Sequence, residues 1–177
     1  MDMDIDNGTL DNYCDKNTPL FLVSSEGVGF ELDRGLLKKS TVLTDLVSGD
    51  PNETEIRFPK FDSKTLEKIV VFLRRDVDYE VISRVRKPII ETDINKILPE
   101  WEVNFVNVPC ELLMAMMNGA DYFNINSMVE LCAIKLAITI KDLTMMDMKT
   151  LFNSGASINA QETDKIRTEN AWICCNN

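Results

Sequence analysis

Apolar and polar positions alternate near the front of the chain with the two-residue period of β-strands. Residues 20–23 form a short apolar run, residues 24–27 have the polar side chains and glycine of a turn, and the apolar residues of 28–32 occupy every second position. This pattern predicts a β-hairpin. A third strand is predicted around Ile56 and Phe58, where a proline ends it.

Helical patterns follow the hairpin. Asp33 can cap a short helix that includes Leu36 and Leu37, and Thr41 can open a second helix, which the turn residues 49–52 end. A third helix is predicted after Asp62 and Ser63, which are both suitable N-cap residues. Its apolar positions recur at i, i+3, i+4 and i+7, the period of one helical face: Leu66, Ile69, Val70 and Leu73.

The middle of the chain loses this periodicity. Residues 76–102 are mixed in character and contain two prolines, which predicts an excursion loop. Pro109 then fits the first turn of a helix, because its missing N–H would have no partner there. Asn118 and Gly119 are expected to end or bend that helix.

Three further helical signals lie in the last third of the chain. Ser127 and Glu130 have the spacing of a capping box, and they precede a helix to about residue 140 that is apolar on most sides and is expected to be largely buried. Thr144 can cap a short helix, and residues 161–175 have the pattern of a final amphipathic helix. Strands first and helices afterwards predict an α+β domain with a helical extension.

The composition narrows the possible functions. A net charge of −10 would repel a phosphate backbone, so we expect no direct binding of nucleic acid. The chain has no histidine, which removes imidazole general bases, Ser–His or Cys–His pairs and imidazole metal sites. No metal cluster or phosphate-binding loop is present in the sequence, and we therefore expect neither catalytic residues, a metal site nor a cofactor.

The cysteines and the termini suggest where the protein works. Five cysteines without C-x-x-C spacing fit a reducing compartment, and the first fifteen residues lack the layout of a signal peptide. No apolar run reaches the ~18 residues of a membrane span. These features predict a cytoplasmic or nuclear protein that does not bind membranes.

Three stretches of the sequence resemble the Skp family of adaptors in SCF, or cullin-RING, ubiquitin ligases. They are residues 22–33, with the strand–turn–strand pattern; 101–108, beginning Trp-Glu-Val-Asn-Phe; and a C-terminal set made of 119–125, 152–153 and 167–172. Their order and spacing are similar to those of the family from about Pro19 onwards. Asp121 departs from the pattern, because the family has an asparagine there that contacts the cullin.

The resemblance implies an α+β fold in three parts. Residues 1–18 would be a flexible acidic tail, residues 19–140 a BTB/POZ domain with the excursion loop at 76–102, and residues 141–177 a C-terminal helical extension that binds F-box segments. The implied function is a non-catalytic adaptor that joins a cullin scaffold to F-box substrate receptors in a heteromeric complex.

The resemblance also implies two sets of binding residues. The cullin would contact Asp121 and Tyr122, although Tyr122 could also be a half-buried residue beside a turn. Methionines at helical spacing are more often part of the core, but the resemblance implies that Met114 and Met117 are divided between core and groove. Trp172 could hold the last helix in place or anchor a partner. The F-box set is Leu113, Met114, Met117, Leu136, Ile140, Met148, Leu151, Phe152, Ile166, Trp172 and Ile173.

Two other functions fit parts of the sequence. The chain could be an F-box-binding structural subunit outside SCF, for example in a kinetochore assembly, which Asp121 would favour. It could also be a self-associating BTB module, although the C-terminal extension is similar to the adaptor branch. An enzyme is the class that the sequence supports least.

Overall fold

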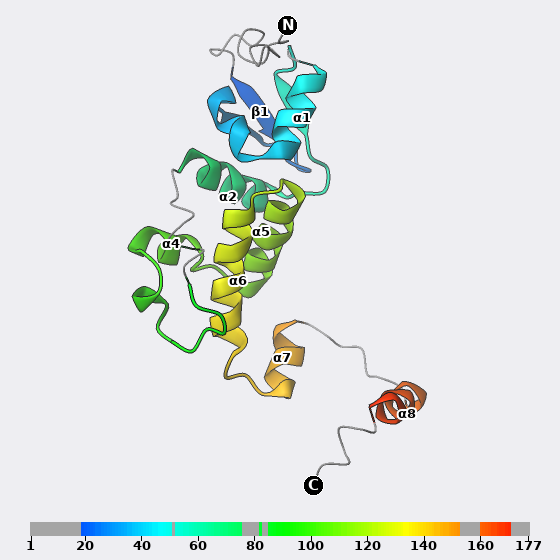
Figure 1. Ribbon diagram of the computed structural model, residues 1–177. Coiled ribbons are helices and arrows are strands. Elements are labelled where there is room, and N and C mark those ends of the chain that lie inside the picture. The colour runs from blue at the N-terminus through cyan, green and yellow to red at the C-terminus, as the bar shows by residue number, and fades with distance from the viewer. Residues whose placement is uncertain (1–18, 51, 76–81, 83–84, 153–159, 171–177) are drawn as a thin grey trace, which may run out of the picture. The chain divides into compact units, whose positions relative to one another are not determined.

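The computed structural model describes residues 19–50, 52–75, 82, 85–152 and 160–170. It divides into two compact units, residues 1–141 and 142–177, and each is considered by itself. The first unit contains the sheet and most of the helices, and the second contains two short helices (Figure 1).

The sheet of the first unit has three short strands in the order β2-β1-β3. β1 (Leu20–Val23) pairs antiparallel with β2 (Gly29–Leu32) and parallel with β3 (Glu55–Arg57). Gly27 supplies the positive φ of 80° in the connecting turn, a conformation that glycine adopts without steric cost. The predicted hairpin is therefore confirmed, and the third strand ends one residue before Phe58.

Short helices with side-chain caps surround the sheet. Asp33 caps the 3-10 helix η1 (Arg34–Lys39), and Ser40 caps α1 (Thr41–Gly49) by accepting a hydrogen bond from the Leu43 N–H. Asp62 caps α2 (Ser63–Arg74) through the N–H of Thr65. These helices confirm the sequence predictions, because their signals are local caps and a regular apolar period.

The predicted excursion loop ends earlier than expected. A 3-10 helix, η2 (Ile94–Lys96), lies within it, and α4 (Glu100–Phe105) begins at Glu100. In α4, the rings of Trp101 and Phe105 stack 5.0 Å apart, and Phe105 lies 5.5 Å from Phe72 of α2. This aromatic contact explains why a helix forms where the sequence has no regular period.

Two antiparallel helices complete the first unit, α5 (Cys110–Tyr122) and α6 (Asn126–Ile140). The prediction that the first of them ends at Asn118 and Gly119 is wrong, since α5 continues to Tyr122. Gly119 is instead a packing position: a β-carbon there would lie 2.7 Å from Cδ1 of Ile69 in α2.

The predicted capping box at Ser127 and Glu130 is also wrong. Asn124 adopts a positive φ of 55°, and the Ile125 N–H donates to the Ala120 carbonyl, which reverses the chain within three residues. As a result α6 already begins at Asn126, and its N-cap residue Ile125 has no side-chain hydrogen bond to offer. Ser127 therefore lies inside the first turn.

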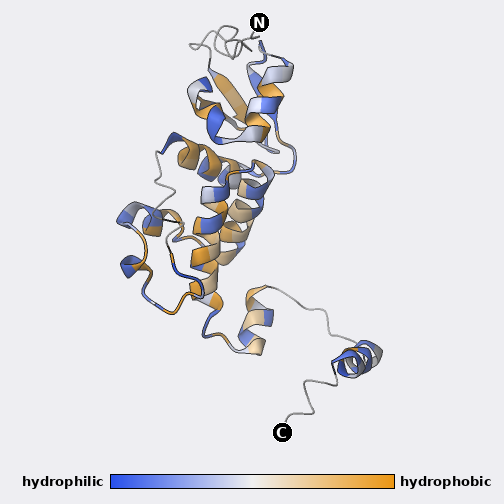
Figure 2. Ribbon diagram, viewed as in Figure 1, coloured by the Kyte–Doolittle hydropathy of each residue, from blue (hydrophilic) through white to orange (hydrophobic). Residues whose placement is uncertain are grey.

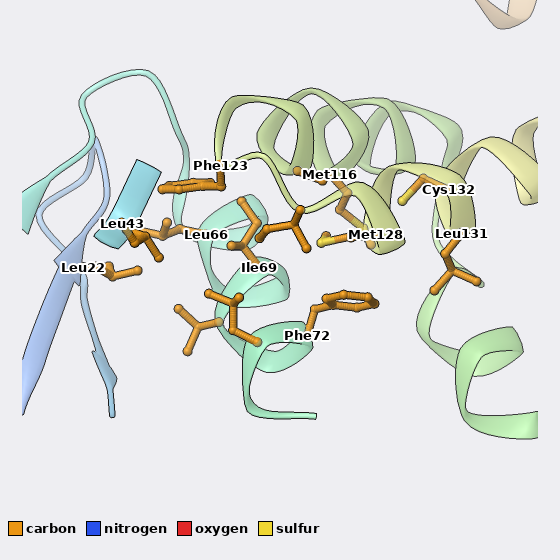
Figure 3. Close-up of a cluster of buried hydrophobic side chains, with 14 of the residues drawn as sticks. Leu22, Leu43, Leu66, Ile69, Phe72, Met116, Phe123, Met128, Leu131 and Cys132 are labelled. Atoms are coloured by element: carbon orange, nitrogen blue, oxygen red, sulfur yellow. The ribbon is translucent and has the colours of Figure 1, made fainter. Parts of the chain in front are cut away.

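Buried side chains from the sheet and five helices form one core. Figure 3 shows Leu22 of β1 and Leu43 of α1 beside residues of α2, with Phe123 above them and Met116, Met128 and Leu131 further along. The side chains labelled in Figure 3 are all fully covered except that of Phe72 in α2, which is 4 % exposed. The close packing fixes the α5–α6 hairpin against α2, and thereby positions the surfaces at both ends of the hairpin.

The second unit has a different character. α7 (Met145–Leu151) begins with a complete capping box, in which Thr144 and Asp147 exchange hydrogen bonds. α8 (Ala160–Glu169) is mainly hydrophilic, whereas α6 is mainly hydrophobic (Figure 2). The remaining part of the predicted final helix, with Trp172 and Ile173, lies outside the described residues.

Candidate protein-binding surfaces

Among the described residues, no group of acidic or cysteine side chains could hold a metal ion. Within the same part of the chain, no helix is long and apolar enough to span a membrane. The features that suggest function are therefore surfaces, and four regions among the described residues present apolar side chains that are exposed or half-buried.

The first region is the open end of the α5–α6 hairpin, where several predicted F-box residues lie. Leu113 is only 2 % exposed and supports the core, while Met117 and Leu136 are half-buried and pack against it. Met114 and Ile140 are half-buried as well. The structure thus brings these residues to one helical pair, with Leu113 beneath the surface and the others partly on it.

The two halves of α6 differ in burial. Met128, Leu131, Cys132 and Ile134 are buried, but every apolar residue from Leu136 to Ile140 is only half-buried. The expectation that this helix is largely buried is correct for its first half and wrong for its second. Within the first unit, the apolar side chains on the last turns of α6 are therefore covered only in part.

The second region is the unit that begins after Lys141. α7 has no buried residue: Met148 and Leu151 are half-buried, Phe152 is 38 % exposed, and Met145 and Met146 are more than 70 % exposed. Ile166, the predicted contact in α8, is 48 % exposed. A short helix with this many uncovered apolar side chains has no core of its own and is only marginally stable without further packing.

The third region surrounds Tyr122, one of the two predicted cullin contacts. The Tyr122 ring is 46 % exposed and lies 5.2 Å from both Phe61 and Phe123, in edge-to-face geometry. Asp121 is exposed beside it. The body of Tyr122 is thus held by aromatic neighbours, and its remaining face is directed to solvent.

A pocket of about 210 Å³ opens next to this tyrosine. The side chains around it come from α1, β3 and the segment before α2, and they are mostly apolar: Leu46, Ile56, Arg57, Phe58, Pro59, Lys60, Phe61 and Tyr122. Sequence reasoning found Tyr122 but not this pocket, because its other residues are more than 60 positions earlier in the chain. The sequence feature that could have indicated the pocket is the pair of phenylalanines, Phe58 and Phe61, on either side of Pro59.

The fourth region is a hollow of about 360 Å³ in the segment before α4. Its walls combine apolar and charged side chains: Val85, Arg86, Pro88, Ile89, Ile90, Glu91, Lys96 and Ile97. Ile90 is 81 % exposed, the highest value among the large apolar residues described. The sequence predicted only a loop here.

These observations define a class of protein: a small α+β domain with a helical hairpin, a helical extension and several uncovered apolar surfaces suited to binding other proteins. Residues 19–78 match the family model described as "Skp1 family, tetramerisation domain". The chain is thus similar to the Skp1 family, at low identity over most of its length, which confirms the resemblance and the predicted POZ-type α+β fold.

Relatives extend the similarity over most of the chain. SKP1-like protein 1A of Arabidopsis thaliana is 25 % identical over 86 % of this chain and 95 % of the relative. The S-phase kinase-associated protein 1 homolog of Tetrahymena thermophila is 24 % identical, with 88 % and 94 % coverage. The "E3 ubiquitin ligase complex SCF subunit sconC" of Arthroderma otae is 28 % identical, with 85 % and 92 % coverage.

Proposed function

We propose that this chain is a non-catalytic adaptor that joins an F-box protein to a cullin in an SCF-type ubiquitin ligase. The observation that carries the proposal is the row of half-buried apolar side chains on the last turns of α6, together with the uncovered apolar side chains of α7. A relative that aligns with 85 % of the chain has a name that makes it an SCF subunit, which supports the same role.

The F-box segment would cover two groups of side chains. On the first unit these are Met114, Met117, Leu136 and Ile140, with Leu113 beneath them; on the second unit they are Met148, Leu151, Phe152 and Ile166, with Trp172 and Ile173 further along the sequence. Fully burying one such side chain contributes about 1.5–3 kcal/mol. Methionine side chains repack easily, so one surface could accept different F-box sequences.

The cullin would dock at Tyr122 and Asp121. The pocket of about 210 Å³ beside Tyr122 is large enough for one apolar side chain of the partner. Its lining includes Lys60 and Arg57, of which Arg57 forms an ion pair with Glu55 at 2.7 Å. A large aromatic residue next to an apolar pocket is the kind of feature that contributes most of the binding energy in protein interfaces. Asp121 would lie at the edge of this contact.

The chain would supply no chemistry to the complex. It has no histidine, and its described residues include no metal-binding group. Its contribution would be to hold two other proteins at a fixed separation, which raises the local concentration of a substrate near the catalytic subunits. Such a role implies a place in the cytoplasm or the nucleus.

Reconstitution with an F-box domain and a cullin N-terminal domain tests the proposal. Met148→Ala with Leu151→Ala should weaken F-box binding at least tenfold and leave cullin binding unchanged, whereas Tyr122→Ala should do the reverse. Lys149→Ala on α7 and Phe21→Ala on the sheet are matched controls, since both remove exposed side chains outside the two surfaces.

The outcome separates the adaptor from the alternatives. A ternary complex that elutes as one species on size-exclusion chromatography is the expected result. F-box binding without any cullin binding would contradict the bridging role and would favour a structural subunit outside SCF.

A further inference from the structure

The segment before α4 is fastened to α6 at two places. The Lys87 ammonium lies 3.5 Å from Oε1 of Glu130, near the start of α6. At the other end, Lys141 directly after α6 donates hydrogen bonds to the Ile90 carbonyl and, at 3.4 Å, to the Thr92 hydroxyl. Residues 85–97, which we call the strap, therefore lie along α6 (Figure 1).

The strap encloses the hollow of about 360 Å³ and gives it a mixed lining. Arg86 and Lys96 supply two positive charges and Glu91 one negative charge, which is 3.7 Å from Lys96. Within the described part of the chain, the Arg86 guanidinium has no hydrogen bond or ion pair. The lining thus has a net positive charge in a protein whose overall charge is −10.

The apolar part of the lining is equally distinctive. Val85, Ile89 and Ile97 are half-buried and pack against the core, whereas Ile90 is 81 % exposed. A large apolar side chain exposed beside a free guanidinium is suited to a ligand that has an apolar group next to a carboxylate. The volume suffices for one or two side chains rather than for a whole helix.

The position of the strap indicates which protein would supply this ligand. Lys141, which holds Ile90, immediately follows Ile140, and Ile140 belongs to the surface proposed for the F-box. A segment that continues from a helix bound at the end of α6 would therefore begin close to the strap. Charge complementarity favours an acidic segment over a basic or a neutral one.

We propose that the strap is a second recognition site, which binds a short acidic and apolar segment next to the F-box in the partner protein. This inference rests on the proposed F-box binding. The Arg86 guanidinium would pair with an Asp or Glu side chain of the segment, and Ile90 would pack against a neighbouring Leu or Phe. Partners with such a flanking segment would be selected over those without it.

Fluorescence anisotropy with three labelled probes tests the inference on the full chain. The first is a bare F-box segment, and the second is the same segment extended, in separate versions at either end, by Asp-Leu-Glu-Phe-Asp. The third has Lys-Leu-Lys-Phe-Lys as the extension. We expect one acidic extension to tighten binding about fivefold or more, as one partly exposed charge pair and one apolar contact would do.

Charge-reversal variants connect this gain to the strap. Arg86→Glu with Lys96→Glu should abolish the gain, leave the bare segment unaffected and favour the lysine extension. Lys38→Glu with Lys64→Glu makes the same change of charge at exposed positions of η1 and α2, and should keep the gain. Lys141→Met should reduce the gain, because it releases the strap from α6.

Each result has one meaning. Equal affinities of the bare and acidic probes, both for the full chain and for a chain without residues 1–18, would overturn the second site while leaving F-box binding intact. Failure of the bare segment to bind would overturn the proposed function itself. Residues 1–18 contain five aspartates and could compete for the strap. If the gain appears only after they are deleted, the strap binds the protein's own N-terminal segment and the inference about a partner is wrong.

Discussion

Gly119 of α5 lies so close to Ile69 of α2 that a β-carbon on the glycine would come within 2.7 Å of the Cδ1 atom of the isoleucine. Thr65 is nearly as close, at 3.3 Å. The helical hairpin and α2 therefore meet at a contact that only glycine permits. Both surfaces proposed for binding depend on this contact, since α5 leads to Tyr122 at one end and to Met114 near the other.

Gly119→Ala should destabilise the protein even though alanine is the better helix former. Overpacking a core position costs about 1–3 kcal/mol, against a gain in helix propensity of about 1 kcal/mol. Ile69→Val removes the clashing Cδ1 atom and costs about 0.5–1.5 kcal/mol alone. In urea unfolding, the variant with both Gly119→Ala and Ile69→Val should be more stable than the sum of the two single losses in unfolding free energy predicts. Strictly additive losses would show that the contact is not tight.

Ser40 joins two distant parts of the chain. Its hydroxyl donates to the Phe123 carbonyl at 2.5 Å and accepts from the Leu43 N–H at 3.2 Å, in a buried position. Ser40→Ala removes the cap of α1 and leaves a buried carbonyl without its partner, so we expect a loss of about 1–3 kcal/mol in the free energy of unfolding. Thr44→Ala, a hydroxyl on the same helix but only part-buried, should cost less.

The stability of α2 should depend on pH through Asp62. Hydrogen bonds from the hydroxyl and the backbone N–H of Thr65 lower the pKa of the Asp62 carboxyl. A lowered pKa means that the ionised carboxyl stabilises the fold above about pH 4, and that this contribution is lost as the pH falls through the folded-state pKa. Asp62→Ala should cost about 0.5–2 kcal/mol at pH 7.

Thermal unfolding at several pH values checks this dependence. The difference between the native protein and Asp62→Ala should narrow as the pH falls from 5 to 3. Asp62→Asn keeps a capping oxygen without a titrating group, so its cap should not change over the same range. A difference that stays constant down to pH 3 would contradict the role of ionisation.

The parts of the fold that could be predicted from the sequence are those with local causes. The hairpin at 20–32, the helix after Asp62 and the capped helix after Thr144 all have their determining residues within one or two turns. Gly119 was misinterpreted because its partner, Ile69, is 50 positions away. The error at Ser127 has a similar source, since the reversal at Asn124 depends on a backbone conformation rather than on a cap.

The candidate binding surfaces, like the fold, could be predicted from the sequence only in part. The resemblance led to Tyr122 and to the apolar residues of α6, but not to the aromatic neighbours that hold Tyr122 in place. It gave no signal for the strap, because the two contacts that fasten it, at Glu130 and Lys141, join residues more than 40 positions apart. Long-range contacts of this kind determine which surface a loop covers.

Cys132 should be chemically inert in the folded protein. Burial raises the pKa of its thiol to about 12, and its side chain is fully covered in the core. The thiolate is the reactive form, so N-ethylmaleimide at pH 8 should not modify Cys132 until the protein unfolds, while half-buried Cys110 should react first of the two. Mass spectrometry of tryptic peptides with and without urea measures both rates. Equal rates in the absence of urea would mean that α6 opens readily.

The capping box of α7 should affect binding more than global stability. α7 has seven residues and no buried side chain, so its helical state depends on the exchange of hydrogen bonds between Thr144 and Asp147. Thr144→Ala should cost about 1 kcal/mol of helix stability. Because few contacts hold α7 in the free protein, this cost should appear when a partner requires the helix, as about fivefold weaker binding of an F-box segment.

Calorimetric titration with the bare F-box segment measures this effect, and thermal unfolding of the first unit serves as the internal control. Thr144→Ser keeps the capping oxygen and should restore most of the affinity. Thr150→Ala removes a hydroxyl that donates a hydrogen bond to the Met146 carbonyl of the same helix, and should have little effect. If Thr144→Ala lowered the melting temperature but not the affinity, α7 would be part of the folded core rather than a binding element that a partner completes.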